Sequence, residues 1–87
     1  MRFRSFQAHC ERMGIELLAD DYKLIDAQLN KFHQSQYKSI LEVYLQKWYE
    51  GTGYAEKASQ HQNLGRNYAN KWLREEGEAQ MMKTEEN

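Results

Sequence analysis

The chain has no proline among its 87 residues, and its apolar side chains recur three and four positions apart almost throughout. This spacing puts apolar residues on one side of an α-helix, and proline is the residue that a helix interior excludes. The alternation of apolar and polar residues that marks a half-buried strand does not occur. The sequence therefore predicts an all-α fold, a compact bundle of four helices with no sheet.

The first two helices are bounded by residues that commonly cap or end helices. A glycine at position 14 predicts that the first helix ends near Met13. Asp20 or Asp21 is suited to cap the second helix, which we expect over residues 21–33. A third helix is predicted from about residue 35 to residue 50.

The third helix should end at Gly51-Thr52-Gly53, the strongest break in the chain, with a glycine cap and a tight turn. Beyond it, residues 54–77 read either as one helix or as a short helix joined to a longer one near Gln62. We favour two helices, with Asn63 as a cap for the second. Residues 1–76 are then a single helical domain, and residues 77–87 an acidic, frayed tail.

A chain of this length has a thin core, so its aromatic residues carry much of the packing. A small core often recruits a second chain, and a homodimer fits that pattern. The helical spacing predicts that the core contains the following residues: Phe3, Phe6, Met13, Ile25, Leu29, Phe32, Leu41, Tyr44, Trp48, Tyr68 and Trp72.

Charge and cysteine content limit the classes of function. Residues 1–74 carry eleven Lys/Arg against eight Asp/Glu, or +3, while residues 75–87 carry one Lys against five Glu, or −4. This falls short of the strongly basic surface of an obligate nucleic-acid binder. The single cysteine, Cys10, fits a reducing cytosol. The sequence shows neither a signal-peptide pattern nor a membrane span, so we expect a cytoplasmic protein.

Residues 62–76, QNLGRNYANKWLREE, sort into two stripes at helical spacing. Leu64, Tyr68 and Trp72 form an apolar stripe, with Ala69 and Leu73 beside it. Planar hydrogen-bonding groups form the other stripe. Asparagine is unfavourable inside a helix, so its repeated use suggests recognition. The expected partner-binding residues are Arg66, Asn67, Asn70, Lys71 and Arg74, with Asn63 next to them.

No catalytic or metal site is predicted. His9 and Cys10 would point about 100° apart on a helix, and Cys10 falls on the apolar face. His33 and His61 lack the spaced ligands that a zinc site needs. We expect no enzyme activity and no cofactor. Tyr44 and Trp48 sit at core spacing, whereas Tyr49 and Tyr54 are suited to an exposed edge, where tyrosine is favoured at protein interfaces.

A DNA-binding alternative rests on two helices, around residues 54–60 and 63–76, arranged as a helix-turn-helix with residues 63–74 as the recognition helix. The usual offset between a small residue and a turn glycine does not fit, because Ala58 is followed four positions later by Gln62. Gly65 falls inside the second helix instead. The motif is weak, but a small DNA-binding transcriptional regulator remains the alternative function.

The arrangement of LEVYLQKW followed by QNLGRNYANKWLRE, within residues 40–75, resembles small, largely uncharacterised accessory proteins of temperate bacteriophages and prophages. The resemblance brings no known active site. It implies a bacterial cytoplasm and a role in modulating a host or phage machine. The expected function is a non-enzymatic protein that docks on a protein complex, as an inhibitor or modulator of defence or transcription machinery. A further hypothesis is that the acidic tail shields the basic helix face in the unbound protein.

Overall fold

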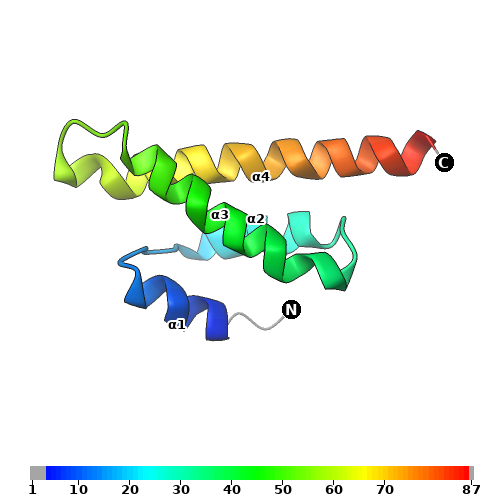
Figure 1. Cartoon of the computed structure of the whole chain (residues 1–87), viewed down its shortest axis with the longest axis horizontal. Coiled ribbons are helices and arrows are strands. Elements are labelled where there is room, and N and C mark those ends of the chain that lie inside the picture. Colours follow the sequence, from blue (N-terminus) through cyan, green and yellow to red (C-terminus); the bar gives the residue numbers. More distant parts are fainter. Residues whose placement is uncertain (1–3, 87) are drawn as a thin grey trace.

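The computed structural model describes residues 4–86 and folds them into four α-helices, with no strand in that range (Figure 1). The helices are α1 (Arg4–Arg12), α2 (Ala19–Leu29), α3 (Tyr37–Thr52) and α4 (His61–Glu86). The 3₁₀ turns η1 (Gln34–Gln36) and η2 (Ala58–Gln60) lead directly into α3 and α4. The prediction of an all-α helical bundle is confirmed.

Helix α4 sets the shape of the molecule. Its 26 residues span about 39 Å at the usual rise per residue, and the longest dimension of the molecule is 46 Å. Helices α2 and α3 pack against α4, and α1 lies at the edge of the molecule away from it (Figure 1). Within residues 4–86 no helix is long and apolar enough to cross a membrane.

The ends of α1 and α2 follow from local backbone bonding. Gly14 has φ of +75°, the left-handed conformation that glycine adopts most easily, so α1 ends close to the predicted residue. Helix α2 ends at Leu29, four residues before the predicted end. There the amides of Lys31 and Phe32 bond to carbonyls only three residues back, which tightens the chain and ends the helix.

The core lies between α2, α3 and α4, with Cys10 and Ile15 added from the N-terminal part. Its largest fully buried side chains are Trp48 and Tyr44. Of the predicted core, Phe32 and Tyr68 are only partly buried and lie outside this cluster, and Phe3 lies outside the described residues. The buried cluster consists of Cys10, Ile15, Ile25, Leu29, Leu41, Tyr44, Leu45, Trp48, Ala69 and Leu73; Phe6, Met13, Leu17, Tyr37, Ile40 and Trp72 pack against it.

Two glycines let the backbones of α3 and α4 touch. A Cβ atom on Gly51 would lie 2.7 Å from the carbonyl oxygen of Leu64, and one on Gly65 would lie 2.6 Å from the ring of Trp48. The predicted helix end at Gly51-Thr52-Gly53 is confirmed, but Gly51 itself is buried inside α3 and does not cap it. Gly53 caps α3 instead, with an ordinary φ of −64°. The glycine at position 51 is therefore required for close packing rather than for a turn.

Helix α4 is rotated by one position from the predicted orientation. Its buried line is Gly65, Ala69, Leu73 and Gly77, each four residues after the last, whereas the predicted stripe of Leu64, Tyr68 and Trp72 is only partly buried. One position corresponds to about 100° around a helix. The rotation carries the neighbouring polar positions toward α2.

The segment expected as a frayed tail is helical. Helix α4 continues unbroken to Glu86, and Gly77 is buried against the side chains of Gln28 and Lys31 on α2. Packing therefore reaches residue 77. Because residues 77–86 extend along the helix axis, they do not fold back over the basic face of the same helix, as the shielding hypothesis requires.

Candidate functional site

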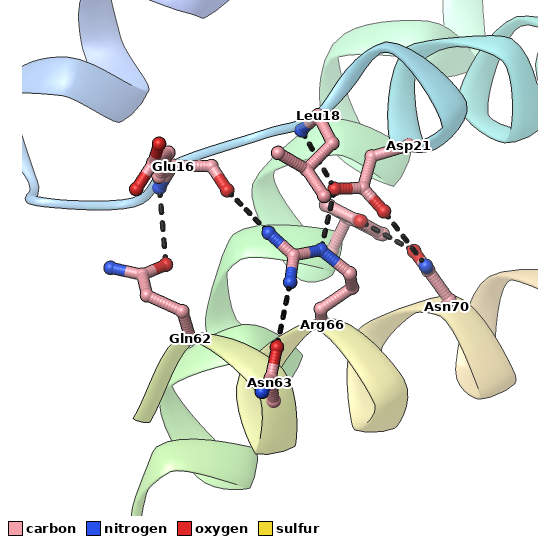
Figure 2. A network of polar contacts seen from close by, with 8 residues as sticks. Glu16, Leu18, Asp21, Gln62, Asn63, Arg66 and Asn70 are labelled. Atoms are coloured by element: carbon pink, nitrogen blue, oxygen red, sulfur yellow. Dashed lines mark hydrogen bonds and ion pairs between the residues drawn. The ribbon is translucent and has the colours of Figure 1, made fainter. Parts of the chain in front are cut away.

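Asp21 is the centre of a buried polar network between α2 and α4 (Figure 2). Only 3% of the residue is exposed. Helix α2 begins at Ala19, so Asp21 lies in its first turn, and its Oδ2 atom accepts a hydrogen bond from the amide of Leu18 at 2.9 Å. Asp20 or Asp21 was predicted to be the N-cap of α2, which is wrong: the N-cap is Leu18, and Asp21 is the third residue of the helix, from which its carboxylate accepts the Leu18 amide. The same carboxylate also receives two donors from α4, which the sequence did not predict.

Arg66 is the main partner of Asp21. Its Nε donates to Asp21 Oδ2 at 2.7 Å, and a terminal nitrogen donates to the carbonyl oxygen of Glu16 at 2.8 Å (Figure 2). The other terminal nitrogen donates to Asn63 Oδ1 at 3.2 Å, so Asn63 lies within α4 and does not cap it. The guanidinium carbon lies 5.3 Å from the centre of the Trp48 ring, within cation–π range. Arg66 is thus fully engaged inside the protein.

Asn70 connects the same carboxylate to α3. Its Nδ2 donates to Asp21 Oδ1 at 3.1 Å, and its Oδ1 accepts from the hydroxyl of Tyr44 at 2.6 Å. Burial of Tyr44, followed by the charge of Asp21, raises the pKa of the tyrosine well above its usual value. Tyr44 therefore remains a neutral donor, and the chain Tyr44–Asn70–Asp21 joins three helices.

The first turns of α4 and the end of α3 also hold the segment between α1 and α2. Gln62 donates through Nε2 to the carbonyl oxygen of Gly14 at 2.7 Å, and its Oε1 accepts from the amide of Glu16 at 3.1 Å. The hydroxyl of Tyr49 donates to the carbonyl oxygen of Met13 at 2.8 Å. We call residues 13–18 the connector. Its backbone is anchored by side chains from α3 and α4.

The predicted partner-binding residues thus separate into two groups. Arg66 and Asn70 face α2 and are used inside the protein. Asn67, Lys71 and Arg74 are exposed to solvent. Neither Lys71 nor Arg74 forms an ion pair with a described side chain. We call the three exposed residues, with Tyr54, the outer face.

The two predicted edge tyrosines differ in their surroundings. Tyr54 is 70% exposed, and its ring centre lies 5.8 Å from that of Tyr68 on α4. Tyr68 precedes Lys71 by three positions, so this aromatic pair lies beside the outer face. Tyr49 is 46% exposed, but its hydroxyl is already bonded to the connector. Tyr54 is the more available of the two for contact.

The described residues do not form a metal-binding site. No group of three His, Cys, Asp or Glu residues within them is arranged to hold an ion. Cys10 is 1% exposed, and burial raises the pKa of its thiol to about 11. A buried neutral thiol is a poor nucleophile. Cys10 therefore acts as a core residue, as its position on the apolar face predicted.

The two-helix unit required by a helix-turn-helix does not form. Between Gly53 and α4 the structure contains only η2, a single turn of three residues that runs straight into α4. The expected short helix over residues 54–60 is therefore wrong, and α4 begins at His61 rather than near Asn63. In addition, Arg66 and Asn70, the planar side chains best suited to read base edges, point into the protein.

Comparison with known proteins finds no match, whether among protein-family models, curated proteins or solved structures.

Sequence reasoning missed the buried acid and the rotation of α4. Gly65 and Gly77 could have indicated the rotation, because a glycine inside a helical pattern often marks a position where another helix packs closely. A face that includes them would have placed Arg66 at its border. No signal in the sequence pairs Asp21 with Arg66, which lies 45 residues further along the chain.

Proposed function

We propose that this chain is a non-enzymatic binding protein that docks on a protein partner through the outer face of α4. The observation that carries the proposal is the position of Lys71 and Arg74. Both are exposed and form no ion pair with a described side chain, and Lys71 follows by three positions Tyr68, whose ring lies against the exposed ring of Tyr54. Arginine and tyrosine are enriched at the centres of protein interfaces. A partner surface with acidic and apolar side chains would complement this face.

The rigidity of α4 supports the same proposal. Its inner side is fixed by the Asp21 network and by the contact of Gly65 with Trp48, so the outer face is held in one orientation. Binding groups on a rigid helix lose little freedom when a partner arrives. Asn67, Lys71 and Arg74 lie at i, i+4 and i+7, the spacing by which one helix face contacts a groove or flat surface.

The setting of this function is proposed from the resemblance of residues 40–75 to temperate-phage accessory proteins. It places the partner in the bacterial cytoplasm, within a host or phage complex of the defence or transcription machinery. The chain would inhibit or modulate that complex. The mixed charge of α4, where Glu75 and Glu78 follow the two basic residues, favours a protein partner over bare DNA.

The test is affinity capture from a bacterial lysate, with and without nuclease. The variant Lys71→Glu/Arg74→Glu reverses the charge of the outer face, and Arg12→Glu/Lys23→Glu is the matched control because both residues are exposed elsewhere. We expect a protein that survives nuclease treatment, is lost from the outer-face variant and is retained by the control.

Two results would contradict the proposal. Recovery of nucleic acid alone, released by moderate salt, would favour the DNA-binding regulator, since phosphate contacts weaken steeply as salt rises. Equal capture by wild type and by both variants would show that the outer face is an ordinary solvated helix surface.

A further inference from the structure

Helix α1 is held to the rest of the protein by little buried surface. Within its nine residues, Cys10 is the one buried side chain. Phe6 packs against the core but is only partly buried. A helix of this length is not stable alone in water, so its folded position depends on these few contacts.

A surface hollow lies on each of two sides of α1. The larger has a volume of about 550 Å³ and is lined by Phe6 of α1 and by Leu41 and Leu45 of α3, among others. The smaller has a volume of about 230 Å³ and is lined by Cys10 of α1 and Tyr22 of α2, among others. Where a hollow lies, α1 lacks the contacts that close packing against its neighbours would supply.

The hydrogen bonds that anchor the connector fall on both sides of Gly14. On the side of α1, the hydroxyl of Tyr49 donates to the carbonyl oxygen of Met13 at 2.8 Å. On the other side, Gln62 donates to the carbonyl oxygen of Gly14 itself at 2.7 Å, and Ile15 is buried in the core. The connector is therefore fixed to α4 from Gly14 onward, while α1 precedes this anchor.

Gly14 is suited to act as a hinge. Its φ is +75°, and a Cβ atom at this position would meet nothing within 4 Å, so open space surrounds it. Glycine changes its backbone angles at low cost. Rotation about its N–Cα bond would move α1 and would leave the carbonyl oxygen of Gly14 in place on Gln62. The same rotation would break the bond from Tyr49 to Met13.

We propose that α1 opens as a unit about Gly14 while α2, α3 and α4 stay folded, and that the hydrogen bond from Tyr49 to Met13 is the latch of this motion. Opening removes one wall of the larger hollow and gives solvent access to Cys10 and to the side chains of Leu41 and Leu45. The inference is independent of the proposed function, because α1 lies away from α4 and its outer face (Figure 1).

The test is the rate at which N-ethylmaleimide alkylates Cys10, the single cysteine of the chain. The rate is measured by mass spectrometry from zero urea to beyond the unfolding midpoint. Local opening exposes little surface, so the rate should hardly depend on urea at first and should rise steeply only where global unfolding begins. Without urea, we expect labelling at least about tenfold slower than in the unfolded chain.

Three variants separate local opening from global unfolding. Tyr49→Phe removes the latch and should raise the labelling rate without urea by about fivefold. Tyr54→Phe, which removes the hydroxyl of a more exposed tyrosine in the loop after α3, is the matched control and should leave the rate unchanged. Ala69→Gly removes a fully buried methyl group from α4. It should lower the urea midpoint without changing the labelling rate at zero urea.

The opposite results overturn the proposal. A labelling rate that falls along one steep line to zero urea shows that Cys10 is reached only when the whole protein unfolds. Faster labelling of Ala69→Gly without urea shows the same. Labelling of the wild type as fast as the unfolded chain excludes a closed position of α1. Equal rates for Tyr49→Phe and the wild type exclude the latch. Circular dichroism checks that each variant keeps its helices.

Discussion

Replacing Arg66 by methionine should destabilise the protein far more than an equivalent change on the outer face. The side chain of Asp21 is 4% exposed and that of Arg66 is 15% exposed, so the pair is largely desolvated. Removing one partner of a buried ion pair costs about 3–5 kcal/mol, because the other charge is left without compensation. Asp21 would still accept bonds from Leu18 and Asn70. We therefore expect the lower end of that range, about 3 kcal/mol.

A loss of this size is a large share of the stability of an 87-residue domain. It corresponds to a fall in melting temperature of roughly 15 °C. Urea unfolding followed by tryptophan fluorescence measures it directly, since Arg66 lies over Trp48. Arg66→Lys keeps the charge but not the planar set of donors, and should lose about 1–2 kcal/mol.

The matched control is Arg74→Met, which removes the same side chain from an exposed position and should change stability by less than about 0.5 kcal/mol. A double-mutant cycle of Asp21→Asn with Arg66→Met should show a coupling of at least about 1 kcal/mol. The reasoning fails if Arg66→Met is as harmless as Arg74→Met, or if the two changes in the cycle are additive.

Three other substitutions examine the core. Gly65→Ala should lower the free energy of unfolding in urea by about 1–2 kcal/mol, because the added Cβ meets the Trp48 ring. Gly53→Ala is the control: its added Cβ has its nearest neighbour at 3.2 Å, so the change should be nearly neutral. Equal effects of the two substitutions would contradict the close contact between α3 and α4. Burial raises the pKa of the Cys10 thiol from 9.0 to about 11, so the thiol ionises first in the unfolded chain. Its contribution is complete below pH 9 and is lost as the pH rises toward 11, by about 2.7 kcal/mol at most. Cys10→Ala should flatten that part of the stability curve, and parallel curves would refute the assignment. The Oε1 atom of Gln28 is buried and has no hydrogen-bond partner in the described chain. Gln28→Met removes this atom and should raise the free energy of unfolding by about 1 kcal/mol. A lower urea midpoint for the variant would show that the amide is needed.

The class of fold could be predicted from the sequence because apolar periodicity and helix-ending glycines are local signals. Gly14 marked the end of α1 closely, and Cys10, Ile25 and Trp48 were all placed on buried faces. These assignments depend only on neighbours a few positions away. Local sequence information was therefore sufficient to predict that the chain forms helices.

The orientation of α4 depends on information that is not local. Gly65 resembles a weak helix position when read alone, and it makes sense only against the ring of Trp48 on another helix. Likewise, Arg66 and Arg74 are equivalent residues in a periodic pattern, and only the buried carboxylate of Asp21 distinguishes them. Part of the predicted binding stripe is therefore used inside the protein.

The hydrogen bonds that anchor the connector are made to its backbone, while Ile15 is buried in the core and Met13 and Leu17 pack against it. Tyr49, Gln62 and Arg66 bond to carbonyl oxygens of residues 13, 14 and 16, and the amide of Glu16 bonds back to Gln62. Main-chain groups are the same in every amino acid, so the exposed side chains of this segment can be exchanged without losing these bonds. The exposed positions Glu16 and Leu18 are thus suitable sites for a fluorophore or a short recognition sequence. A fluorophore attached there would be held in a fixed position by the anchored backbone, although the connector has no regular secondary structure of its own.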